Sequence, residues 1–214
     1  HKVIMSADWQ LRGERTPADY LQTADFFAEA GAYASSVSEP VYAFTLGDET
    51  WDICWGDHNF GLPEFREFAK PFPVPLYTII GNHDHNPAAT NDFTAAAIYR
   101  KVLGPTNYSL NIGDVHYIVM DDVAYTPSTR ATVEQFTEDQ LEWLRADLSH
   151  VSKVTPIVFC AHVPLHKWTW SGTEWKAAER GVNYSKALEM LKEYEMVHIF
   201  KGHSHFNEFF DVRE

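Results

Sequence analysis

Eight side chains of this sequence could bind a metal ion or move a proton, and each follows a short apolar run typical of a β-strand. They supply carboxylate, amide and imidazole groups and are Asp8, Gln10, Asp48, Asn82, His83, His162, His203 and His205. Oxygen and nitrogen donors without a thiolate suit a borderline or hard divalent cation such as Zn, Mn, Fe or Mg. Because eight candidates are too many for one ion and a carboxylate can bridge, we expect two ions close together.

Two pairs of these residues share an alternating spacing. Asp8 and Gln10 are two positions apart, and so are His203 and His205. Residues at i and i+2 of an extended segment point the same way, so each pair can present two ligands to one place. The alternation therefore supports the expectation of two ions.

The elements that must position these residues alternate between strand-like runs and amphipathic stretches. A Thr-Pro start at 16–17, a Gly-Asp turn at 113–114 and a capping box from Thr137 mark several boundaries. Strands are predicted over 2–7, 41–46, 76–80, 108–112, 115–120, 155–161, 197–201 and 206–212. Helices are predicted over 17–38, 62–70, 90–103, 137–149 and 185–194. This order indicates an α/β domain, in which the carboxyl ends of strands meet at one ligand-binding crevice.

Composition limits the class of protein. The chain has 214 residues, 45% of them hydrophobic and 22% charged, which is ordinary for a globular domain and excludes disorder, collagen and a membrane span. We therefore expect residues 1–214 to form a single domain. The net charge of -13 opposes binding of a nucleic-acid polymer and favours a small ligand or a metal.

The cysteines and the first residue give weaker information about disulfide bonds and about the extent of the natural chain. Only Cys54 and Cys160 are present, and Cys160 lies in an apolar run typical of an inert core thiol. The chain begins with His1 and contains no signal-like start, so we expect that a leading segment was removed or that the domain was excised from a larger protein.

Joined in order, the polar segments form one pattern: strand-DxQ, strand-GD, strand-GNHD, strand-H and strand-GHxH. Each segment alone is common in loops and turns. Together, from Val3 to His205, they resemble the calcineurin-like metallophosphoesterase superfamily, in its bacterial phosphohydrolase branch with an Asp-x-Gln first motif. The resemblance implies a four-layer αββα sandwich of two mixed β-sheets flanked by helices. It also implies flanking domains in the full-length protein and favours a location outside the cytoplasm.

The same resemblance assigns roles to the candidate residues. Asp8, Asp48 and His205 hold the first ion, with Gln10 as a weaker ligand where most members have His. In the alternative, Gln10 is a loop residue that hydrogen-bonds its neighbours, and the first site is partly empty. Asp48, Asn82, His162 and His203 hold the second. His83 is then not a ligand but a general acid beside the phosphoryl group. Asp52, Asp84, Asp121 and Asp122 are candidates to orient the imidazoles.

The implied activity is hydrolysis of a phosphate monoester or diester of a small organic, sugar or lipid-linked substrate by a metal-activated hydroxide. A nucleotide phosphodiesterase or pyrophosphatase of the same fold is an alternative. A catalytically weak metal-binding recognition domain is another, which Gln10 favours and His83 opposes. A zinc hydrolase of the metallo-β-lactamase type would need an HxHxDH cluster, and the sequence has none.

Tryptophans gather beside the motifs. Six of the seven lie there, at Trp9, Trp51, Trp55, Trp168, Trp170 and Trp175, whereas Trp143 has the spacing of a helix core. For about half of the six we expect only that the loops pack on one another. For the others we expect an aromatic-lined mouth to the metal site, with irregular specificity loops over 51–63 and 164–183. The substrate contacts predicted there are Trp51, His85, His166, Trp168 and Trp170.

Overall fold

The computed structural model describes residues 1–11, 17–51, 61–86, 88–126 and 131–205 of the chain. Its strands form two larger sheets and two hairpins. A parallel sheet has the order β1-β2-β3, with strands Lys2–Ser6, Val41–Thr45 and Leu76–Tyr77. A mixed sheet has the order β11-β8-β5-β4, with strands Val197–Phe200, Ile157–Cys160, Val115–Val119 and Tyr108–Ile112. Only β4 runs antiparallel in the mixed sheet, through its pairing with β5.

The two sheets face each other across an apolar layer. The ring of Phe44 on β2 stacks on Tyr117 of β5, with centroids 5.2 Å apart and planes 12° from parallel. Leu46, Ile79 and Val119 belong to the same buried cluster. Cys160 lies in this layer with no solvent exposure, so the sequence prediction of an inert core thiol is confirmed.

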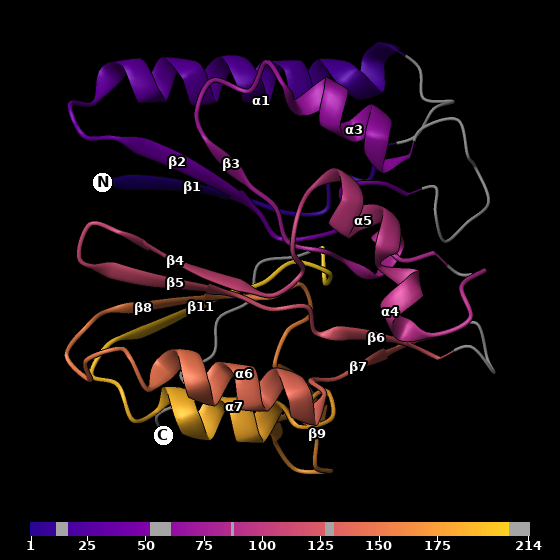
Figure 1. Ribbon diagram of the computed structural model, residues 1–214, viewed down its shortest axis with the longest axis vertical. Helices are drawn as coiled ribbons and strands as arrows, with labels where there is room; N and C mark the ends of the chain where they lie inside the picture. The colour runs from indigo at the N-terminus through magenta and orange to yellow at the C-terminus, as the bar shows by residue number, and fades with distance from the viewer. Residues whose placement is uncertain (12–16, 52–60, 87, 127–130, 206–214) are drawn as a thin grey trace.

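Helices cover the outer side of each sheet (Figure 1). Helix α1, Pro17–Ser36, and α3, Leu62–Ala69, lie against the parallel sheet. Helix α6, Glu138–Leu148, and α7, Tyr184–Leu191, lie against the mixed sheet and share a core cluster with Phe159 of β8. The Thr137 capping box is present at the start of α6, as the sequence predicts. None of the helices in the described residues is long and apolar enough to cross a membrane.

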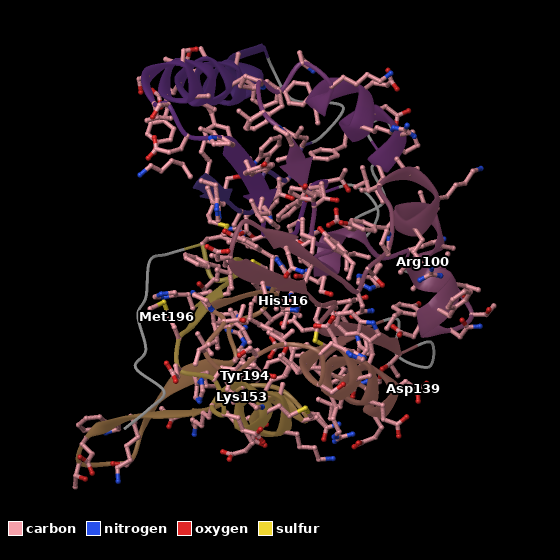
Figure 2. All side chains as sticks on the ribbon, turned by 60° about the vertical axis from the view of Figure 1, so that its left-hand side comes forward. Arg100, His116, Asp139, Lys153, Tyr194 and Met196 are labelled. Atoms are coloured by element: carbon pink, nitrogen blue, oxygen red, sulfur yellow. The ribbon has the colours of Figure 1, made fainter. Side chains whose placement is uncertain are left out.

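Two hairpins depart from the expected elements. Strands β6, Val123–Thr126, and β7, Ala131–Glu134, form one. The other consists of β9, His166–Trp170, and β10, Trp175–Glu179, and Figure 2 shows it extending beyond the helices. The prediction of an irregular loop over 164–183 is therefore wrong, because residues 166–170 and 175–179 pair strand to strand around a turn at Gly172, where φ is +97°.

Smaller differences concern element ends. The helix predicted over 90–103 is interrupted at Ala96, which has φ -89° and ψ 8°, giving α4, Asp92–Ala95, and α5, Ala97–Val102. The strand predicted over 76–80 is shortened to β3, and a 3-10 turn, η1, Asn82–Asp84, follows it. The strand predicted over 206–212 lies outside the described residues.

Candidate metal centre

The segments that follow β1, β2, β3, β8 and β11 meet at one edge of the two sheets. Backbone hydrogen bonds hold them together: the Asp8 N–H donates to the Gly47 carbonyl at 3.0 Å and the Gln10 N–H to the Asp48 carbonyl at 2.9 Å. The Gly202 N–H donates to the His162 carbonyl at 2.9 Å. The structure thus brings the strand-end residues together, as the sequence predicts.

One group of candidate ligands forms a tight cluster, which we call the second cluster: Asp48, Asn82, His162 and His203. Asn82 Oδ1 lies 3.0 Å from His162 Nε2 and 2.9 Å from His203 Nδ1. The two ring nitrogens are 3.2 Å apart, and Asp48 Oδ2 is 3.3 Å from His162 Nε2. Asp48, His162 and His203 together satisfy the spacing of a metal site.

The geometry of the second cluster fits a divalent cation. Neighbouring ligand atoms about 2.1 Å from one ion lie roughly 3 to 3.4 Å apart. The four distances above, 2.9 to 3.3 Å, agree with this spacing. His162 Nδ1 lies 2.8 Å from the Leu46 carbonyl and donates to it, so Nε2 faces the cluster. A second hydrogen bond that fixes the ring in this way is typical of metal-binding histidines.

The carboxylates and imidazoles of the second cluster shift one another's pKa, and His162 would have to lose its proton to bind a cation. Burial opposes ionisation of Asp48, but the positive charges of His162 and His83 outweigh it and lower the pKa of Asp48 to about 2. Burial likewise opposes protonation of His162, yet the Asp48 and Asp8 carboxylates raise its pKa to about 10. Burial and the charge of His162 lower the pKa of His203 to about 4, so this ring is neutral, as a ligand must be.

The other group of candidate ligands, which we call the first cluster, consists of Asp8, Gln10, Asp48 and His205. Asp48 therefore belongs to both clusters. His205 Nε2 lies 3.3 Å from Asp8 Oδ1 and 3.2 Å from Gln10 Nε2. Gln10 Nε2 is also 3.4 Å from Asp48 Oδ2. Turning the Gln10 amide by 180° exchanges its nitrogen for its oxygen at this point, which is the orientation that a cation requires.

The backbone at the ligands has an unusual conformation. Asp8, Gln10, Asp48, His203 and His205 all have φ between 46° and 67°, in the left-handed region. They make up five of the six non-glycine residues with positive φ in the described part of the chain. Such conformations are uncommon outside glycine and gather at functional sites, where surrounding structure holds them in place.

Two motif glycines allow the loops to approach closely. A Cβ on Gly81 would lie 2.2 Å from the backbone nitrogen of Asp48, and one on Gly47 would lie 2.4 Å from His162 Nδ1. Neither neighbour can move without disturbing a ligand. The glycines of the GD and GNHD motifs are therefore required by the contact between the loops.

His83 lies beside the shared carboxylate. Its backbone N–H donates to Asp48 Oδ1 at 2.8 Å, and its Nε2 lies 3.8 Å from Asp48 Oδ2. The ring stacks on Trp51, with centroids 4.3 Å apart and planes 18° from parallel. Burial lowers the pKa of His83 against the opposing effect of Asp48.

The candidate orienting carboxylates contact backbone more than imidazole. Asp84 accepts the N–H groups of Gly81, Glu49 and Thr50 at 2.9 to 3.2 Å. Asp122 accepts the backbone N–H of His162 at 3.1 Å. They fix the ligand loops rather than the ligand rings, and Asp52 lies outside the described residues.

Three charged residues near the ligands have no motif spacing that would mark them in the sequence. Glu49 is fully buried and accepts a hydrogen bond from Thr45 Oγ1. Glu134 Oε1 lies 3.7 Å from His203 Nε2 and pairs with Arg180. Among these three, only Glu49 could have been found from the sequence, because it directly follows the GD motif. Glu134 and Arg180 are positioned by hairpins that the hydrophobic periodicity does not predict.

The residues predicted to contact substrate lie in different surroundings. His85 is 1% exposed; its Nδ1 lies 2.9 Å from the Gly81 carbonyl and its Nε2 3.6 Å from Asp121 Oδ2. His166 is half-buried on β9, paired with Glu179, and burial lowers its pKa. Trp170 is 55% exposed on the same strand, and the backbone of Trp168 lies between them.

Two partly buried tryptophans pack against core clusters. Trp9 lies against Phe26, Phe27 and Phe72 under α1, which agrees with the packing alternative for this tryptophan. Trp143 on α6 packs against the core, as predicted. Trp55 and the side chains of Trp168 and Trp175 lie outside the described residues.

Comparison with known proteins agrees with this geometry. Residues 2–207 match the family model for calcineurin-like phosphoesterases. The chain is also similar to purple acid phosphatase 13 of Arabidopsis thaliana, with 26% identity over 171 residues. That match covers 72% of this chain and 26% of the plant protein. The family match spans nearly the whole sequence, and the chain therefore belongs to the calcineurin-like phosphoesterase family.

Proposed function

We propose that the protein is a dinuclear metal-dependent phosphohydrolase acting on an ester of a small organic, sugar or lipid-linked alcohol. The observation that carries this proposal is the position of Asp48 between the two clusters. Its Oδ2 lies 3.3 Å from His162 Nε2 on one side and 3.4 Å from the Gln10 amide on the other. A carboxylate in that position can bridge two ions.

Each cluster would hold one ion. The first would bind Asp8, Gln10, Asp48 and His205, and the second Asp48, Asn82, His162 and His203. When bound, a pair of divalent cations lowers the pKa of a shared water and neutralises charge on the phosphoryl oxygens. Manganese, zinc, iron and magnesium all suit these donors.

His83 would supply the proton for the leaving alkoxide. Because burial lowers its pKa, the protonated ring is a stronger acid than an exposed histidine, but a smaller fraction of it carries the proton near neutral pH. The stack on Trp51 and the backbone bond to Asp48 would hold the ring beside the shared carboxylate.

We also propose the finer architecture of the family for this chain. Apolar clusters lie between α1 and the parallel sheet, between the sheets, and between the mixed sheet and α6 and α7. This succession supports a four-layer αββα sandwich, and we propose that residues 1–214 form one catalytic domain.

Substrate contacts are part of the same proposal. Trp51 would line the approach to the phosphoryl group because it covers His83. His166, Trp168 and Trp170 would contribute from the β9–β10 hairpin. His85, being buried against Gly81, would position the GNHD turn.

Metal removal and replacement test the function. We expect the metal-depleted protein to regain two ions by mass spectrometry when Mn, Zn, Fe or Mg is added, and to hydrolyse p-nitrophenyl phosphate or bis-p-nitrophenyl phosphate. Comparing the two esters separates monoesterase from diesterase activity. Two bound ions without turnover of either ester would favour a recognition domain instead.

A further inference from the structure

A pocket of about 520 Å³ lies directly beside the second cluster. Asn82 and His203, both members of that cluster, form part of its wall. Its volume falls in the usual range for small-molecule sites, about 300 to 1,000 Å³. A phosphoryl group bound at the second cluster would therefore have this pocket next to it.

Four valines give the pocket an apolar wall: Val123, Val133, Val163 and Val182, which we call the valine pocket. Val123 and Val163 are buried, whereas Val133 and Val182 are 37% and 53% exposed. A bound organic group that covers exposed apolar side chains removes them from water, and this burial favours binding.

The charged residues of the valine pocket neutralise each other. Arg180 Nε donates to both carboxylate oxygens of Glu134 at 3.1 and 3.0 Å, and Nη2 donates to Oε1 at 2.9 Å. This two-pronged pair leaves no excess positive charge to attract a second phosphate group. Among the described residues, no tryptophan lines the pocket.

We propose that the valine pocket binds the organic group of the phosphate ester, so that compact, uncharged, apolar alcohols are preferred over nucleotide or polyphosphate groups. This inference rests on the proposed function, which places the phosphoryl group at the second cluster. It differs from the aromatic-lined mouth in naming aliphatic side chains as the specificity surface.

Two pairs of compounds test the proposal, butyl against methyl phosphate as substrates and butylphosphonate against methylphosphonate as ligands that are not hydrolysed. We expect kcat/KM and affinity to rise with chain length, by about fourfold for each methylene that the pocket covers. Val182→Asp and Val133→Asp should each reduce this preference at least tenfold. Val154→Asp is the matched control, because Val154 is 64% exposed and does not line the pocket.

Calorimetric binding of the phosphonates separates the two proposals. If no ester is hydrolysed but wild-type protein still binds butylphosphonate more tightly, and Val182→Asp abolishes the difference, the proposed function fails and the valine pocket stands. Equal affinities for the two phosphonates in the wild type would overturn the valine pocket. The valine pocket would also be overturned if Val182→Asp and Val133→Asp both kept the preference for butylphosphonate, or if the wild type bound neither phosphonate.

Discussion

Asp122, which is wholly buried, accepts a hydrogen bond from the backbone N–H of His162 at 3.1 Å. The same carboxylate accepts the Val163 N–H at 2.9 Å and the Tyr184 hydroxyl at 3.1 Å. The start of α7 and the loop carrying a metal-binding imidazole are thereby joined through one side chain.

Replacing Asp122 should therefore affect both stability and metal binding. We expect Asp122→Ala to lower the free energy of unfolding by about 3 kcal/mol, because several buried donors lose their acceptor. Affinity for the second ion should fall about 10- to 100-fold, as for other groups that orient a ligand. Urea denaturation and calorimetric metal titration measure the two effects. Tyr184→Phe is the control: it removes one donor and should leave metal affinity unchanged.

Loss of the His83 ring should slow turnover without removing the metals. We expect His83→Ala to lower kcat about 100- to 10,000-fold, the usual contribution of a general acid. The backbone N–H that contacts Asp48 is retained, so metal content by mass spectrometry should match wild type. Trp51→Leu, which removes only the stacked ring, should reduce kcat less. Loss of both ions in His83→Ala would contradict the assignment.

Gln10 should make the first ion the weaker of the two. An amide oxygen binds a divalent cation less strongly than an imidazole, so Gln10→His should tighten the weaker binding step at least tenfold. Histidine is among the residues that tolerate the positive φ of 46° found at this position. Calorimetry with manganese or zinc follows the change. If Gln10→Ala binds two ions as tightly as wild type, Gln10 is not a ligand.

A carboxylate far from the metal centre should control stability in acid. Asp147 on α6 accepts a hydrogen bond from Ser109 Oγ at 2.5 Å and pairs with His116 Nε2 at 2.8 Å. Burial opposes its charge, but the bonds from His116 and Ser109 outweigh burial and hold the pKa of Asp147 below its usual range. Because the folded state lowers this pKa, the stabilisation is complete above the unfolded pKa of about 3.9. It disappears as the pH falls through the lower folded value.

We therefore expect Asp147→Asn to lower the free energy of unfolding at pH 7 by about 2 kcal/mol. The difference from wild type should shrink as the pH falls below the unfolded pKa of about 3.9. Urea denaturation between pH 7 and pH 2 measures it. Asp114→Asn, at an exposed carboxylate in the turn between β4 and β5, should follow the wild type at every pH. A constant difference over the whole range would exclude ionisation of Asp147 as the cause.

Sequence patterns predicted the location of a site residue correctly where that residue follows a regular strand. Strands β1, β2, β8 and β11 lie within the predicted segments, and the polar residues after them meet in space, because α/β strands gather their carboxyl ends. Asp48, His162 and His203, all at strand ends, form the predicted kind of cluster.

Residues brought in by hairpins could not be predicted in the same way. Glu134 and Arg180 approach His203 only because β6–β7 and β9–β10 fold back beside the mixed sheet. Neither has a spacing that indicates metal chemistry. The surroundings of Trp9 could not be predicted for a related reason: its neighbours in sequence are candidate ligands, but its ring lies against Phe27 and Phe72.

The left-handed backbone at five of the proposed ligands limits how this centre can be redesigned. Asparagine, aspartate, histidine and glycine tolerate that conformation, whereas valine, isoleucine and threonine do not. Substitutions at these positions that aim to alter metal preference are therefore limited to the few residue types that tolerate this backbone conformation. In libraries that randomise Asp8, Asp48 or His205 over all amino acids, many members would be strained at the required backbone.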